Sequence, residues 1–148
     1  MYKTILVPLD GSDRAEAILS HVVELAQRLE SKLVLLQVID PATAYAGLEG
    51  LPAEVTRDLI NQQAEQAKTY LETRCGELEA RHIDAKAVVR YGAVPQTILD
   101  VAEAEKADLI AIASHGRSGL SRIFYGSVAA AVLQRADRPL LLIRATNN

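Results

Sequence analysis

Apolar residues along the chain fall into two patterns, short continuous runs and longer stretches with helical spacing. The continuous runs predict strands at 3–9, 32–39, 108–113 and 138–144, and the run at 84–92, although interrupted by polar residues, predicts a further strand. The helical spacing predicts helices at about 13–30, 54–80, 93–106 and 126–136. The longest stretch with neither pattern is 40–53. Strands and helices therefore alternate from one end of the chain to the other.

This alternation predicts an α/β fold, an open five-stranded parallel sheet with helices on both faces. The run KLVLLQVI at 32–39 is apolar almost throughout, as expected for a strand covered on both sides. The run at 84–92 alternates between apolar and polar residues, which favours an edge of the sheet. No repeat or linker interrupts the pattern, so we expect a single domain over 1–148.

Composition narrows the class of protein. The net charge is −3 and the aromatic residues are five tyrosines and one phenylalanine, which argues against nucleic acid as a partner. One cysteine rules out an internal disulfide framework. The N-terminal apolar run is broken by Pro8 and Asp10 and is too short for a signal peptide or a membrane span. We expect a cytoplasmic protein with no membrane partner.

Two polar, glycine-bearing turns follow predicted strands, PLDGS after the first and ASHGRSG after the fourth. Ligands of open parallel sheets bind at the carboxyl ends of the strands, so neighbouring strands would bring both turns to one crevice. The second turn leads to a helix beginning at Gly126 and Ser127, and a helix N-terminus binds phosphate through its free N–H groups. The alternatives are that Asp10 and Ser127 only cap helices and that the glycines only make turns.

The better-known phosphate and hydrolase motifs are absent. The sequence contains no G-x-x-x-x-G-K-[ST], no G-x-G-x-x-G after the first strand and no G-x-S-x-G. A Walker-type loop, a dinucleotide-binding Rossmann unit and a nucleophile elbow are therefore disfavoured.

The chain resembles the universal stress protein (UspA-like) family, in its ATP-binding branch, from YKTILVPLDGS to the end of RPLLLIR. That branch carries the signature G-x2-G-x9-G-[ST]. Gly116, nine further residues and then Gly126-Ser127 match it, whereas Ala113 stands at the first glycine position. The resemblance implies a Rossmann-like sheet of strand order 3-2-1-4-5 and a homodimer, often joined through the last strand, here 139–143.

The resemblance also implies a site for ATP, with Mg²⁺ assisting. Asp10 would contact adenosine, Pro8 would line the pocket and Val38 would flank the adenine. Backbone or hydroxyl groups would reach the ribose and phosphates from Ala113, Gly116, Gly126, Ser127 and Val128. Arg117 is a candidate phosphate contact, and a solvated loop charge is its alternative.

Three classes of function follow. The first is an ATP-binding regulatory module of the stress response, the second a slow ATPase, and the third an interaction dimer whose nucleotide site has decayed. Phosphoryl transfer needs a metal holder, a positioned water and charge stabilisers, and Asp10 is the sole acid expected near the loop. This favours binding over efficient catalysis. Because 113 continues the apolar run DLIAIA, we expect negative φ there, so that alanine is unstrained and ATP still binds.

Overall fold

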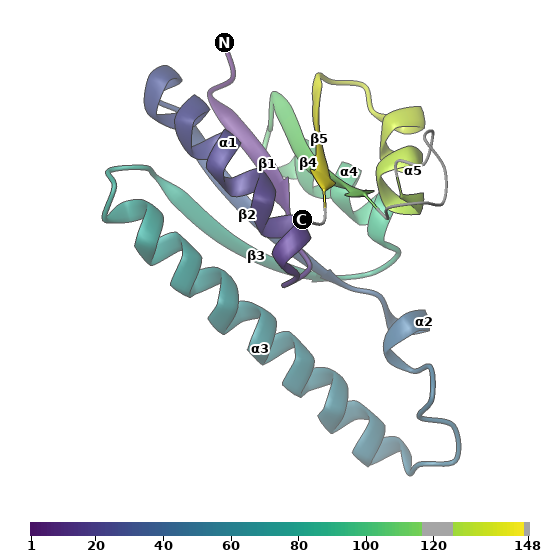
Figure 1. Ribbon diagram of the computed structural model, residues 1–148. Helices are drawn as coiled ribbons and strands as arrows, with labels where there is room; N and C mark the ends of the chain where they lie inside the picture. The colour runs from purple at the N-terminus through teal and green to yellow at the C-terminus, as the bar shows by residue number, and fades with distance from the viewer. Residues whose placement is uncertain (117–125, 147–148) are drawn as a thin grey trace.

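The computed structural model describes residues 1–116 and 126–146 (Figure 1). Its strands are β1 (Thr4–Pro8), β2 (Lys32–Ile39), β3 (Ala85–Tyr91), β4 (Leu109–Gly116) and β5 (Leu140–Thr146). Its helices are α1 (Asp13–Leu29), α2 (Pro41–Ala44), α3 (Ala53–Glu79), α4 (Val94–Ala104) and α5 (Ser127–Arg135). Every predicted strand and helix is present. No helix of the described part of the chain is both long enough and apolar enough to cross a membrane.

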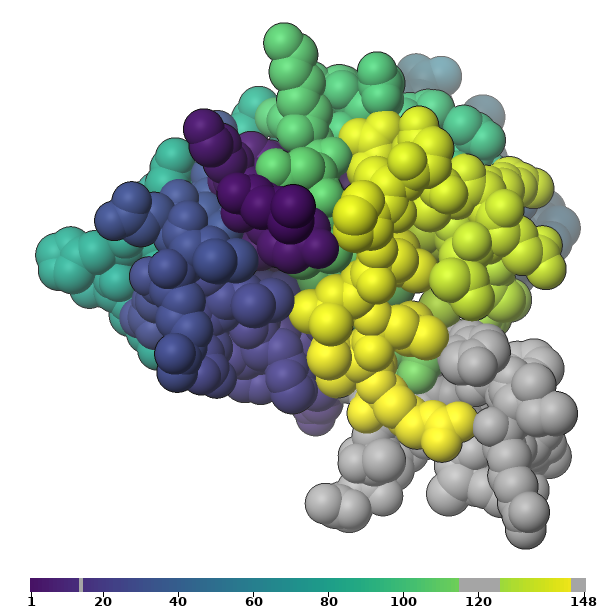
Figure 2. Space-filling model, turned by 90° about the horizontal axis from the view of Figure 1, so that it is seen from above, coloured from purple at the N-terminus to yellow at the C-terminus, as the bar shows by residue number. Residues whose placement is uncertain are grey.

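The strands form one parallel sheet of order β3-β2-β1-β4-β5, which confirms the implied order and the edge position of β3. One apolar cluster joins the sheet to α1 and α3, and a second joins its other face to α4 and α5. Figure 1 shows this arrangement of three layers. Seen from above, β5 lies at the surface between α1 and α5 (Figure 2). The helices therefore cover both faces, as predicted.

The pairing of β1 opens the sheet at its carboxyl end. β1 pairs with β2 as far as Pro8↔Leu36, but it pairs with β4 only at Ile5↔Leu109 and Leu6↔Ile110. β4 continues beside β5 as far as Gly116. The strands β1 and β4 thus part before either ends, and a crevice forms between them at the place where the strand order reverses.

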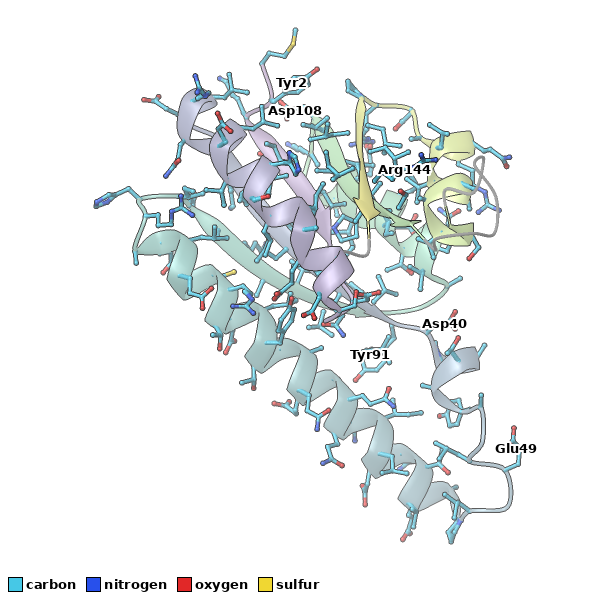
Figure 3. The ribbon with its side chains drawn as sticks, viewed as in Figure 1. Tyr2, Asp40, Glu49, Tyr91, Asp108 and Arg144 are labelled. Atoms are coloured by element: carbon cyan, nitrogen blue, oxygen red, sulfur yellow. The ribbon has the colours of Figure 1, made fainter. Side chains whose placement is uncertain are left out.

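At the opposite edge of the sheet, where the parallel strands begin (the amino edge), Asp108 links β1 to the start of β4 by hydrogen bonds. Its carboxylate accepts the backbone N–H groups of Lys3 (2.8 Å) and Thr4 (3.1 Å), and its own N–H donates to the Thr4 carbonyl (2.9 Å). Asp108 and Tyr2 are both at this edge (Figure 3). The register of the central strand pair is therefore fixed by side-chain as well as backbone hydrogen bonds.

Three helix-to-strand connections at the amino edge are closed in the same way. Each has a non-glycine residue in the left-handed region just after the helix: Glu30 (φ 54°), His82 (φ 62°) and Lys106 (φ 54°). The following N–H donates to the carbonyl five residues earlier: Ser31 to Ala26, Ile83 to Leu78 and Ala107 to Ala102, at 2.9–3.0 Å. This is the Schellman arrangement, in which glycine is the usual residue.

Two elements differ from the sequence prediction by more than two residues at either end. The segment 40–53, expected to be irregular, contains the single-turn helix α2, whose first N–H groups are capped by the Asp40 carboxylate (2.9 Å to Ala42 N). The fourth strand continues to Gly116 and does not end at 113, because its backbone keeps pairing with β5 after the apolar run has ended.

Candidate functional site

A cavity of about 210 Å³ lies at the carboxyl ends of β1, β2 and β4. The sheet contributes Pro8, Leu9, Asp10, Leu36, Val38, Ile112, Ala113 and Ser114 to its lining. The helices contribute Ser12, Ala15, Val94, Ile98, Val128 and Ala129. It occupies the crevice between β1 and β4 and is roofed by α4 and α5. The two glycine-bearing turns were predicted to meet here, and the turn after β1 does line it.

One wall of the cavity is apolar. Val38, Val94 and Val128 pack against the cluster beneath α4 and α5, and Ile98 and Ile112 belong to that cluster. A flat apolar ring entering from the mouth would be held between aliphatic side chains of β2, α4 and α5. Pockets for small ligands typically combine such a surface with a few convergent polar groups.

Asp10 is the acid in the lining, and its hydrogen bonds define its role. The cap of α1 is Ser12, whose Oγ accepts the Ala15 N–H (3.2 Å). Asp10 Oδ1 in turn accepts the N–H (2.9 Å) and hydroxyl of Ser12. Asp10 therefore supports the cap and is not itself the cap. Its second oxygen, Oδ2, makes no hydrogen bond within the described part of the chain and is available to a ligand in the cavity.

The N-terminus of α5 forms another side of the cavity. Gly126 is the N-cap, at φ 77° and ψ 147°, a backbone conformation that favours glycine. Ser127 is the first helical residue and is exposed, so the N-cap alternative for its hydroxyl is wrong. Val128 and Ala129 line the cavity. The first N–H groups of a helix have no acceptor within it, so α5 offers donors and the positive end of its dipole here.

Ala113 lies inside β4, paired with Ile143. It is not among the four non-glycine residues with positive φ in the described ranges, so the expected strand conformation is confirmed. Ala111 belongs to the cluster beneath α1 and α3, and Ala113 packs against that cluster, whereas Ile110 and Ile112 belong to the cluster on the other face. Side chains alternate along a strand. The Ala113 methyl therefore points to the α1 side, the side from which Ala15 also lines the cavity.

The predicted site residues are largely brought together. Those lining the cavity are Pro8, Asp10, Val38, Ala113 and Val128. Gly126 and Ser127 precede Val128 at the start of α5, and Gly116 ends β4 three residues after Ala113. Arg117 lies outside the described residues.

Sequence reasoning missed several lining residues. Ser114 is 2% exposed and lines the cavity beside Ala113. Its position at the carboxyl end of a strand, on the face shared with Ile112, was a signal that could have found it. Val94 and Ile98 were assigned only to a helix, because apolar residues with helical spacing predict a buried face whether or not a cavity adjoins it.

The cavity suits a metal only if the ligand brings most of the oxygens. Within the described ranges, no group of three or more His, Cys, Asp or Glu side chains could hold a metal ion. Mg²⁺ is usually bound through one or two carboxylates together with substrate phosphates. Asp10 is the one carboxylate among the described residues of this lining, so the residues present fit Mg²⁺ only as a companion of a phosphorylated ligand.

The chain is similar to universal stress proteins over nearly all of its length. The sequence profile of the Universal stress protein family matches residues 1–144. Universal stress protein MJ0577 of Methanocaldococcus jannaschii is 32% identical over 159 residues, covering 100% of this chain and 98% of that protein. Its solved structure has a TM-score of 0.85 and covers 100% of this chain and 99% of that one.

Two further solved structures share the fold. Universal stress protein UspA from Lactobacillus plantarum has a TM-score of 0.80 at 30% identity, covering 97% of this chain and 98% of that one. A universal stress protein from Archaeoglobus fulgidus, solved in complex with dAMP, has a TM-score of 0.63 at 21% identity, covering 96% and 98%. The chain therefore belongs to the universal stress protein family, as its strand order, the family profile and these relatives together show.

Proposed function

We propose that this protein binds ATP in the cavity between β1 and β4 and acts as a nucleotide-dependent regulatory module of the stress response, in the cytoplasm. The observation that carries the proposal is the pairing of an apolar wall with the N-terminus of α5 across one cavity. The dAMP complex of the Archaeoglobus fulgidus protein, which shares this fold, supports an adenine nucleotide as the ligand class.

The chemistry of the lining favours one orientation of the bound nucleotide. Val38 on β2 and Val94 on α4 are partly exposed and offer the apolar surfaces that suit adenine. A phosphate beside the Asp10 carboxylate would suffer like-charge repulsion, so Oδ2 of Asp10 suits a ribose hydroxyl. The phosphates then belong at the start of α5, where the N–H groups of the first turn can donate. Mg²⁺ would be held chiefly by these phosphates.

The same lining argues against efficient hydrolysis. No lysine, arginine or histidine lines the cavity among the described residues, and Asp10 is the one carboxylate there. Since that carboxylate already accepts two hydrogen bonds from Ser12, it is poorly suited to activate a water. We therefore expect ATP to remain largely intact in a single-turnover assay with purified protein, and rapid release of phosphate would favour the ATPase alternative.

The test of the site is Gly126→Val compared with Gly47→Val. Both glycines have positive φ, 77° and 81°, but Gly47 lies between α2 and α3, with nothing within 4 Å of an added Cβ. Calorimetric titration with ATP and Mg²⁺ should show affinity falling at least 100-fold, about 2.7 kcal/mol, in Gly126→Val and unchanged in Gly47→Val. A folded Gly126→Val protein with unaltered affinity would overturn the assignment.

We propose in addition that the protein is a two-fold dimer joined through residues 139–143. β5 pairs with β4 along one side and ends the sheet order, so in the described chain its other edge has no strand partner. Antiparallel pairing of two β5 strands would satisfy those backbone groups. Sedimentation should show a dimer at micromolar concentration, and a monomer there would count against this interface.

A further inference from the structure

Residues 40–66 form an arm that extends beyond the carboxyl edge of the sheet (Figure 1). The arm consists of Asp40, α2, the connection 45–52 and the first half of α3. No residue of α2 is buried, and in this half of α3 only Thr56 and Ile60 are. Ile60 packs against Ile39 and Ala44 in a small cluster separate from the two main ones. The arm is therefore attached along a narrow strip and presents most of its surface to solvent.

Large apolar side chains are exposed on this arm. Tyr45, Leu51 and Val55 are 48%, 46% and 42% exposed. Tyr91, at the end of β3, is 52% exposed, and its ring projects toward the space between α2 and α3 (Figure 3). These four are the majority of the seven exposed large hydrophobic residues in the described chain. Tyr45 and Leu51 line one hollow of the arm, and exposed apolar residues that gather in this way mark a contact surface more often than single scattered residues do.

The arm also contains a cavity of its own, of about 410 Å³. Tyr45, Leu48 and Leu51 provide its apolar lining, and Glu49 and Arg57 stand in the same lining. This volume is enough to receive an aliphatic side chain from outside. It is separate from the nucleotide cavity, with which it shares no lining residue.

The charge of the arm itself is strongly negative. The arm carries Asp40, Glu49, Glu54, Asp58 and Glu65 against a single cation, Arg57. The whole chain has 19 Asp and Glu and 16 Lys and Arg, so outside the arm the two signs nearly balance. In the described part of the chain, none of the four glutamate and aspartate residues from 49 to 65 is in an ion pair. Figure 3 shows Glu49 directed away from the body of the protein.

We propose that the arm is a docking surface for a basic amphipathic segment of another protein. Such a segment would place an aliphatic side chain in the cavity beside Leu51 and cover Val55, while its lysines and arginines face Glu54 and Asp58. Apolar anchors rimmed by opposite charge give both affinity and orientation at protein interfaces. A second copy of this chain fits less well, because its surface outside the arm carries no comparable excess of positive charge.

A designed peptide tests this directly. The probe is a fluorescein-labelled 14-residue helical peptide with leucines on one face and lysines on the other, and its comparison peptide has glutamate in place of every lysine. Fluorescence anisotropy with the full chain should show the lysine peptide binding at micromolar concentration, more weakly as salt rises. The glutamate peptide should not bind. Absence of lysine-peptide binding at 100 micromolar, or equal binding of both peptides, would overturn the proposal.

Matched variants locate the site. The double variant Leu51→Ser, Val55→Ser should weaken lysine-peptide binding at least tenfold, about 1.4 kcal/mol. Leu29→Ser, on a residue of α1 that is 42% exposed, should change it less than twofold. Equal weakening in both variants would refute a site on the arm. Sedimentation is the second readout: if the arm variants alone change the oligomeric state of the free protein, the occupant is a second copy and the proposal is wrong.

Discussion

Gly92→Ala is expected to destabilise the protein by distorting the turn that carries α4. Gly92 follows β3, and its N–H donates to the Ile39 carbonyl (3.1 Å). Its φ is +152°, outside the regions that residues with a Cβ adopt easily. A Cβ built there would stand 2.5 Å from Thr97 Oγ1, well inside van der Waals contact. Thr97 is in the first turn of α4 and is only 9% exposed, so it has little room to yield.

Two separate costs add at this position. The backbone strain of a non-glycine residue in this region is about 1–3 kcal/mol. Forcing an extra carbon into a packed site costs about 1–3 kcal/mol more. The expected loss in the free energy of unfolding is therefore about 2–6 kcal/mol. Since Val94 and Ile98 of α4 line the nucleotide cavity, ATP affinity should fall with it.

Urea denaturation measures the loss in the free energy of unfolding as a shift of the midpoint, when the m value, the dependence of that free energy on urea concentration, is the same in all variants. Thr97→Ala removes the Oγ1 in question, so a double-mutant cycle should show Gly92→Ala costing about 1–3 kcal/mol less on that background. Gly76→Ala is the matched control, because Gly76 is an exposed helix residue with nothing within 4 Å of an added Cβ. It should stabilise by about 0.5–1 kcal/mol.

A Gly92→Ala variant whose midpoint is unchanged, or shifts in the same direction as that of Gly76→Ala, would contradict this prediction. Gly92→Ala could also destabilise the protein equally with and without Thr97→Ala, and this result would contradict only one part of the prediction. The cost would then lie in the backbone alone, and the close approach to Thr97 would be wrong.

Three further changes test β4, the C-terminal end of α4 and the thiol of Cys75. Calorimetric titration should show that Ala113→Gly changes ATP affinity less than tenfold, about 1.4 kcal/mol. If the unaltered protein does not bind ATP and the Ala113→Gly variant does, the alternative of a decayed nucleotide site is favoured. Arg138→Ala should cost about 2 kcal/mol in urea, because its guanidinium donates to the carbonyls of Ala102 (3.0 Å) and Ala107 (2.8 Å), and Arg138→Lys should restore little. Burial and two nearby glutamates raise the pKa of Cys75 from 9.0 to about 11, so it should alkylate with iodoacetamide at pH 8 about 100-fold more slowly than an ordinary thiol. The rate should climb with pH until about pH 11, and a rate equal to that of the urea-unfolded chain would contradict this.

The layer arrangement could be predicted because four strands are continuous apolar runs, β3 alternates between apolar and polar residues, and each long helix has a periodic face. α2 could not, because four residues are too few to show a helical period. The end of β4 was placed three residues early, since Ser114, His115 and Gly116 break the apolar run while their backbones still pair with β5. Strand pairing between segments distant in sequence leaves no mark in a local pattern of hydrophobicity.

The candidate site was predictable where a residue type has one strong conformational use. Gly126, which has positive φ, is of this kind. Ser127 was harder, because serine serves equally as a cap or as a first helical residue, and the conformation of the preceding glycine decides between them. Which face the Ala113 methyl takes depends on the register of β4, which only the folded sheet fixes.

The three left-handed connections at the amino edge offer an engineering route. Glycine in place of Glu30, His82 or Lys106 would relieve up to about 1 kcal/mol each, at positions that do not line the nucleotide cavity. A protein carrying all three would be a reinforced background in which harsh changes such as Gly126→Val could be made without losing the folded state. Binding and folding could then be measured as independent quantities on the same molecule.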